Sequence, residues 1–181
     1  QATVTDFATL RRTHEACLPD AVRREVVVQH EVIFLLAGDG IQQLGVTARL
    51  VQTNWTSLIP ALQRGDFHIA LNGIEWTPGR AQAVALTRPY YIFEQQLVVR
   101  RNDTTLHKLS DLRGHSVGTL ESSLAHTMLG RIPGVRVRTY EGQVEPYRDL
   151  KLGRLDAVFM DRPIAQYYAL PDTALRFAGP P

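Results

Sequence analysis

Arg80 follows the predicted start of a helix, where an arginine indicates a neighbouring anion. Thr77 is suited to cap that helix and Pro78 to occupy its first position, so Arg80 falls in the first turn. The positive end of the helix dipole disfavours a cation there. An anion held by the guanidinium and by free backbone N–H groups would account for the arginine. A surface arginine paired with a neighbouring acid is the alternative.

Two further polar groups follow strand-like runs. Residues 116–120 lead into hydroxyl residues, and Ser123 at the start of the next helix predicts a second anion site. Ordinary capping by Ser122 is the alternative. Asp161 ends another apolar run and could hold an ammonium group, whereas capping of the next helix or pairing with Arg162 would be a structural role.

Trp55 completes the group of candidate binding residues. It precedes a predicted helix, where a tryptophan either packs half-buried or offers its flat face to a ligand. Arg80 and Ser123 could hold a carboxylate, Asp161 an ammonium, and Trp55 an apolar part of the same molecule. The four residues are therefore complementary to a zwitterionic amino acid.

The elements that must position these groups contain a unit that occurs twice. Gly65 and Gly153, 88 residues apart, each separate a helix end from a short apolar run, in the segments LQRGDFHIALNG and LKLGRLDAVFMD. The repeat predicts two similar α/β lobes whose strand ends, at Gly73 and Asp161, face each other across a cleft. Ligands of open α/β sheets bind at the carboxyl ends of strands. Chance similarity is the alternative.

Apolar runs and capping residues predict an alternation of strands and helices. Strands are expected at residues 47–52, 67–72, 95–100, 116–120, 135–140, 157–160 and 175–178. Helical segments are expected at residues 32–44 with a cap at Gly45, at 57–63, from 77 onward, and at 109–112, 123–130, 145–152 and 163–170. Residues 6–12 and 21–28 are compatible with helix but lack a clear period. This alternation indicates βαβ units and mainly parallel sheets.

Composition restricts the class of protein. The 181 residues, 44% hydrophobic and 21% charged, form one large or two small globular domains. A net charge of +2 with scattered basic residues argues against nucleic-acid binding. A single cysteine, Cys17, excludes an intramolecular disulfide and a cysteine metal cluster, and the six histidines are dispersed, so we expect neither metal nor cofactor.

Membrane and targeting segments are not evident in the sequence. No apolar run approaches the length of about 18 residues that a membrane-spanning helix needs. No signal-peptide pattern begins the chain, which indicates a mature, trimmed or cytosolic protein.

Several motifs, taken together and in order, resemble a known family. They are LIPALQ-x-G at residues 58–65, TP-x-R at 77–80, PYY at 89–91, LSDLRG at 109–114, GRLDAV at 153–158 and DRP at 161–163. Over residues 31–181 the chain resembles the amino-acid-binding proteins of ABC importers, the type II periplasmic solute-binding proteins. The resemblance implies an α/β, two-lobed periplasmic-binding-protein-like fold with mainly parallel sheets.

The resemblance also assigns roles at the carboxylate end of the ligand. Arg80 matches the family arginine that clamps the α-carboxylate. Ser123 and Leu124 match a pair in the second lobe that donates to the same carboxylate; Leu124 stands where a threonine is usual. Trp55 lies where the family usually has an aromatic residue stacked on the ligand.

At the ammonium end, Asp161 resembles the acid that takes the α-ammonium group. Gly73 matches a position that contacts the ammonium through its carbonyl, and Glu75 one that does so through a serine or threonine side chain. The carboxylate of Glu75 leads us to expect a preference for polar or basic amino acids.

The resemblance divides the chain into an unassigned segment, residues 1–30, a partial first lobe, 31–96, a second lobe, 97–178, and a second hinge region, 179–181. Residues 95–101 and 175–181 resemble the two hinge strands. Family members usually continue past the second hinge strand, so we expect the first lobe to be incomplete.

The implied function is binding of a small amino acid between the lobes for delivery to an ABC importer, without catalysis, in the periplasm or another extracytoplasmic compartment. The expected partners are the amino acid and the permease subunits, with membrane contact only through the permease or a fused segment. One alternative is a ligand-sensing domain of a membrane receptor. Another, with less support, is a dehydratase-like enzyme, which would need a general acid such as Glu75 or Glu121.

Overall fold

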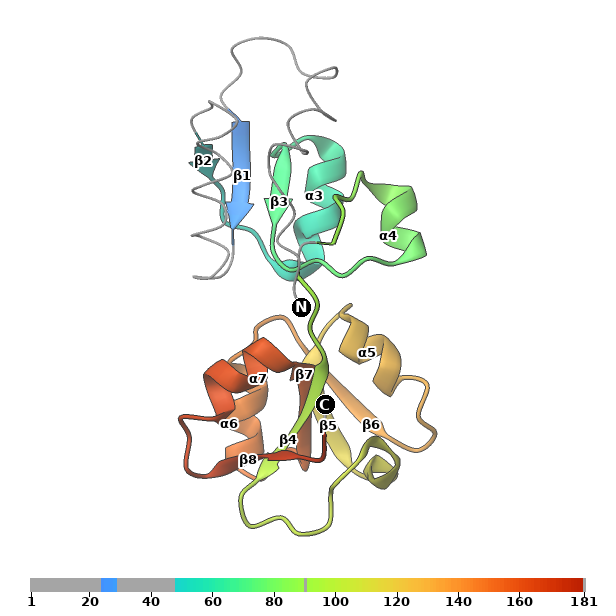
Figure 1. The fold of residues 1–181 in the computed structure, drawn as a ribbon, viewed down its shortest axis with the longest axis vertical. Coiled ribbons are helices and arrows are strands. Elements are labelled where there is room, and N and C mark those ends of the chain that lie inside the picture. The colour runs from blue at the N-terminus through green and yellow to red at the C-terminus, as the bar shows by residue number, and fades with distance from the viewer. Residues whose placement is uncertain (1–23, 29–47, 90, 181) are drawn as a thin grey trace. The chain divides into compact units, whose positions relative to one another are not determined.

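Two separate β-sheets organise the chain (Figure 1). The computed structural model describes residues 24–28, 48–89 and 91–180. The chain divides into unit 1, residues 1–92, and unit 2, residues 93–181, with one sheet in each. The fold is α/β, and the strands are mostly parallel, as the sequence predicts.

Unit 1 contains a three-stranded parallel sheet in the order β2-β1-β3. Its elements are β1 (Arg24–Val28), β2 (Ala48–Leu50), the 3₁₀ turn η2 (Trp55–Ser57), α3 (Leu58–Arg64), β3 (Ile69–Leu71) and α4 (Pro78–Ala83). Leu58 and Ala61 of α3 are buried with Phe67, and Val51 and Ile74 pack against them. This small core holds α3 against the sheet whose strand ends lead into the candidate residues.

Unit 2 contains a five-stranded mixed sheet in the order β6-β5-β7-β4-β8. Its elements are β4 (Gln95–Arg100), the 3₁₀ turn η3 (Leu109–Leu112), β5 (Ser116–Leu120), α5 (Leu124–Leu129), β6 (Arg136–Tyr140), α6 (Glu145–Lys151), β7 (Ala157–Asp161), α7 (Arg162–Ala169) and β8 (Leu175–Ala178). Strands β6, β5 and β7 are parallel, whereas β4 runs antiparallel to both β7 and β8. Each strand predicted in this unit is present.

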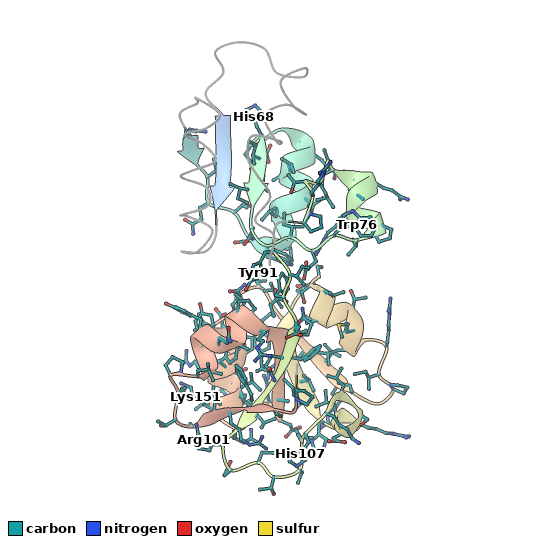
Figure 2. The ribbon with its side chains drawn as sticks, in the orientation of Figure 1. His68, Trp76, Tyr91, Arg101, His107 and Lys151 are labelled. Atoms are coloured by element: carbon teal, nitrogen blue, oxygen red, sulfur yellow. The ribbon has the colours of Figure 1, made fainter. Side chains whose placement is uncertain are left out.

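Helices cover both faces of the unit 2 sheet (Figure 1). On one face, Val117 and Phe159 of the sheet form a buried apolar cluster with Ala125 and Leu129 of α5. On the other face lie α6 and α7. Near the end of β4, the Arg101 guanidinium donates to the backbone oxygens of Thr173 and Leu175, at 2.6 and 3.0 Å, and so joins β4 to the start of β8 (Figure 2).

The repeated helix–glycine–strand unit is present in both units. α3 is followed by Gly65 and β3, and α6 by Gly153 and β7, and both glycines have the left-handed conformation, with φ of 80° and 72°. The hydrogen bonds repeat as well. The N–H groups of the two glycines donate to Leu62 O and Leu150 O, each at 3.1 Å. The N–H groups of the residues that follow them, Asp66 and Arg154, donate to Ala61 O at 3.0 Å and to Asp149 O at 2.9 Å. This is the Schellman arrangement of a helix end.

One sequence prediction at the N-terminus is wrong. Residues 21–28 were compatible with helix, and 1–30 were unassigned, but Arg24–Val28 forms β1, the central strand of the unit 1 sheet. A central parallel strand is a short apolar run without alternation, which periodicity does not separate from a buried helix. The helices predicted at 6–12 and 32–44, the cap at Gly45 and Cys17 lie outside the described residues.

Replacement of Gly153 by alanine tests the stabilising role of the left-handed turn after α6. A methyl group there would meet no heavy atom within 4 Å, so backbone strain is the expected cost. We expect Gly153→Ala to lower the free energy of unfolding by about 1 kcal/mol, measured by circular dichroism in urea. Gly79→Ala is the control, because Gly79 is helical and its surroundings are equally open. An equal loss in both variants would contradict this explanation.

Candidate functional site

The candidate residues of unit 1 all follow parallel strands of its sheet. Trp55 begins the turn after β2, while Gly73, Glu75 and Arg80 come after β3. Because β1 pairs in parallel with both β2 and β3, these strands end at one edge of the sheet. Gly73 has a φ of +52°, a turn conformation that suits glycine and redirects the chain after β3.

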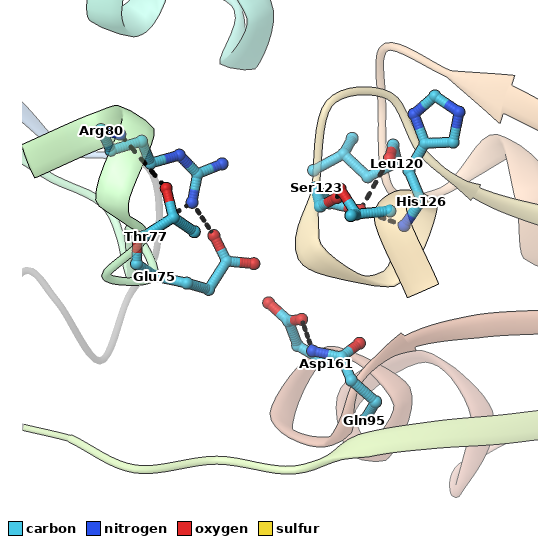
Figure 3. Close-up of polar contacts among 9 residues, drawn as sticks. Glu75, Thr77, Arg80, Gln95, Leu120, Ser123, His126 and Asp161 are labelled. Carbon is cyan, nitrogen blue, oxygen red and sulfur yellow. Dashed lines mark hydrogen bonds and ion pairs between the residues drawn. The ribbon is translucent and has the colours of Figure 1, made fainter. Parts of the chain in front are cut away.

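Arg80 is fixed at both its backbone and its guanidinium. Thr77 caps α4 as predicted: its Oγ1 accepts from the Arg80 backbone N–H at 3.2 Å, and Pro78 begins the helix. Arg80 Nη1 donates to the backbone oxygen of Glu75 at 3.0 Å and to Oε2 of the Glu75 carboxylate (Figure 3). The anion beside this arginine is therefore a neighbouring acid of the same chain, as in the alternative considered from sequence, although that alternative placed the arginine on the surface.

This ion pair is not a surface pair. The side chains of Arg80 and Glu75 are only 17% and 8% exposed. The Arg80 guanidinium also lies over the Trp55 ring, with Cζ 5.4 Å from the ring centroid, a cation–π contact. The structure thus brings three of the predicted residues together in a partly buried cluster, which we call the unit 1 cluster: Trp55, Glu75 and Arg80.

In unit 2, Asp161 lies at the end of β7, and Ser123 and Leu124 follow β5. Strands β5 and β7 are parallel neighbours, so these residues share one edge of the sheet. Asp161 Oδ1 accepts a 2.7 Å hydrogen bond from Gln95 Nε2 (Figure 3). The register of the antiparallel pair β4–β7 places Gln95 directly opposite Asp161.

Of the two structural roles considered for Asp161, capping of the next helix is wrong. Asp161 precedes α7, but its side chain makes no capping hydrogen bond. The Arg162 guanidinium lies 3.3 Å from Glu94 Oε2. The carboxylate of Asp161 accepts a hydrogen bond from an uncharged amide, that of Gln95.

Ser123, rather than Ser122, caps helix α5. Ser123 Oγ accepts from the His126 backbone N–H at 3.1 Å and donates to the Leu120 backbone oxygen at 2.8 Å (Figure 3). Ser122 has a φ of +58°, a left-handed conformation unusual for serine. The single hydroxyl proton of Ser123 is thus already used within the helix start. Leu124 is the first residue of α5.

Sequence reasoning missed Gln95 and Tyr147. The Tyr147 side chain is buried, and its hydroxyl has no hydrogen-bond partner within the described residues. Burial raises the pKa of the Tyr147 hydroxyl far above its ordinary value, and the negative charge of Asp161 adds to the rise, so the phenol stays protonated. Only the pairing of β4 with β7 identifies Gln95 as a partner of Asp161, and no local motif carries that information.

The described part of the chain contains neither a metal-binding cluster nor a membrane-spanning helix. No group of three or more His, Cys, Asp or Glu side chains there is arranged to hold a metal ion. None of its helices combines the length and apolar character that a membrane span requires.

The chain is similar to known proteins over most of its length. Residues 36–167 match the family model described as bacterial extracellular solute-binding proteins, family 3. The L-cystine-binding protein TcyJ of Escherichia coli (strain K12) is 31% identical over 123 residues, covering 67% of this chain and 46% of that protein. The ABC transporter arginine-binding protein 1 of the same strain is 34% identical over 107 residues, covering 58% and 43%. The chain thus spans less than half the length of either relative.

A solved structure shows the same similarity in three dimensions. An ancestral arginine-binding protein bound to arginine superposes with a TM-score of 0.81 and 26% sequence identity. The superposition covers 86% of this chain and 78% of that one.

Substitution of Ser123 tests its structural role at the start of α5. We expect Ser123→Ala to lower the free energy of unfolding by about 1 kcal/mol, because the cap of α5 is lost, as measured in a urea titration. Ser122→Gly is the matched control, since glycine tolerates the positive φ at that position. The control should be as stable as the wild type or more so; a loss there, with none in Ser123→Ala, would show that the assignment of the cap is wrong.

Proposed function

Because the chain belongs to family 3 of the bacterial extracellular solute-binding proteins, we propose that it binds an amino acid with a polar or basic side chain and delivers it to an ABC importer outside the cytoplasm. The observation that carries the proposal is one charged residue of opposite sign at the strand ends of each unit: Arg80 after β3, and Asp161 at the end of β7. These are the two charges that a zwitterionic ligand requires.

In this proposal Arg80 binds the α-carboxylate and Asp161 the α-ammonium group. The guanidinium fork suits a carboxylate, and the Asp161 carboxylate is oriented by the amide of Gln95. Gly73 contributes its carbonyl to the ammonium, and Trp55 a face for the aliphatic part of the ligand. From unit 2, Leu124 contributes its backbone N–H, while Ser123 must release its bond to Leu120 before its hydroxyl can donate to a ligand.

The preference for a basic ligand follows from the balance of charge. Arg80 supplies one positive charge, whereas Glu75 and Asp161 supply two negative charges. An amino acid with a cationic side chain carries the opposite set, one negative and two positive charges, so its charges are complementary to those of the site. The named ligand of one relative and the bound ligand of the solved structure, both arginine, support this class.

Binding rather than catalysis is the function that the described residues favour. A dehydratase needs a general acid, and Glu75, one of the carboxylates considered for that role, is already engaged by Arg80. Calorimetry with arginine, histidine, glutamine and leucine, together with analysis of each ligand after incubation, tests the proposal. We expect arginine, whose side chain is cationic, to bind most tightly and every ligand to be recovered unchanged. Tight binding of leucine alone, or conversion of a ligand, would contradict it.

Removal of the arginine tests its proposed role directly. We expect Arg80→Ala to weaken the binding of L-arginine by about 100-fold or more, because a charged hydrogen-bond partner of the carboxylate is lost. Isothermal titration calorimetry measures the change, and circular dichroism checks the fold. Arg64→Ala is the control: Arg64 pairs with Asp66 on the surface of the same unit. Affinity close to that of the wild type in Arg80→Ala would refute the role.

A further inference from the structure

The Arg80 guanidinium that is proposed to receive a ligand carboxylate already holds a carboxylate of the chain. Its Nη1 donates both to the backbone oxygen of Glu75 and to Oε2 of the Glu75 carboxylate (Figure 3). The backbone contact, at 3.0 Å, is independent of the Glu75 side chain. The guanidinium can therefore stay in place if the Glu75 carboxylate moves away.

Three contacts keep Arg80 in position without the Glu75 carboxylate. Its backbone N–H is held by Thr77 Oγ1, its Nη1 by the Glu75 backbone oxygen, and its guanidinium by the Trp55 ring. Glu75 lies before the helix cap rather than within α4, so rotation of its side chain leaves the helix intact. Arg80 is thus held in place by contacts of its own, whereas the Glu75 carboxylate can change its partner.

Displacement of the Glu75 carboxylate has a cost that depends on the ligand. Both side chains of the pair are largely withdrawn from solvent. A ligand carboxylate that takes over Arg80 leaves the Glu75 carboxylate without that cation in a partly buried place, which is unfavourable. A second positive group on the ligand removes this penalty, whereas a neutral side chain does not.

We propose that the Glu75–Arg80 ion pair exchanges partners when ligand binds, and that this exchange selects amino acids with a cationic side chain over neutral ones. Arg80 passes from Glu75 to the ligand carboxylate, and Glu75 passes to the side-chain cation. The inference rests on the proposed function, and it adds that Glu75 competes with the ligand carboxylate for Nη1 of Arg80 and that a basic ligand offsets the loss of this contact.

The matched ligands L-arginine and L-citrulline test the exchange, because citrulline has nearly the shape of arginine without its side-chain charge. The full chain and its Glu75→Gln variant are titrated with both ligands by calorimetry. The wild type should prefer arginine. In Glu75→Gln citrulline should bind more tightly and arginine less tightly, so that the ratio of the two affinities falls by about tenfold or more. An unchanged ratio overturns the exchange.

Controls separate this inference from the proposed function. Asp66→Asn removes a carboxylate from the exposed Arg64–Asp66 pair of the same unit and should leave the ratio unchanged. Glu75→Thr, a second neutral variant, should reproduce the effect if Glu75→Gln does not fold. If Arg80→Ala abolishes the binding of arginine, but both Glu75 variants keep the wild-type ratio of arginine to citrulline affinity, the exchange alone is overturned. A wild type that binds neither ligand overturns both proposals.

Discussion

The partly buried ion pair between Glu75 and Arg80 is the interaction on which the unit 1 cluster depends. Separation of a guanidinium and a carboxylate that are both largely shielded from water is unfavourable in free energy unless another charge replaces the lost partner. The turn at Thr77 and Pro78 brings Arg80 back over Glu75, and Trp55 covers the guanidinium. Local chain geometry therefore places a cation beside a carboxylate of its own chain.

The scaffold supplies these groups through the ends of parallel strands. In each unit a helix closes in a left-handed glycine turn, at Gly65 or Gly153, and passes directly into a strand. The side chains that follow those strands are held by short-range contacts in unit 1 and by the pairing of β4 with β7 in unit 2, which sets Gln95 against Asp161. The same helix–glycine–strand unit thus precedes a cation of helix α4 in unit 1 and an anion at the end of β7 in unit 2.

Most of the elements could be predicted from sequence, because each has a local signal. The strands at residues 95–100, 116–120 and 175–178 have the predicted bounds, since apolar runs between turn residues define them. The Thr77 cap was identified from the proline that follows it. β1 was missed because the pairing of its backbone, rather than a periodic pattern, makes it a central strand.

The site was less predictable because its contacts depend on side-chain distances. Sequence spacing indicated that Arg80 needs an anion, but it could not decide between a ligand and Glu75, which the turn brings within hydrogen-bonding distance. The assignment of the α5 cap was wrong by one residue, since Ser122 takes a left-handed conformation that is unusual outside glycine, asparagine and aspartate. Gln95 could not be identified, because its role depends on strand register.

The most direct test of this account is a crystal structure of the chain with bound L-arginine. The account predicts that the ligand α-carboxylate lies within hydrogen-bonding distance of the Arg80 guanidinium and the α-ammonium beside Asp161, while the Glu75 carboxylate has left Arg80 for the side chain of the ligand. A complex in which Glu75 still holds Arg80 and the ligand carboxylate lies elsewhere would contradict it.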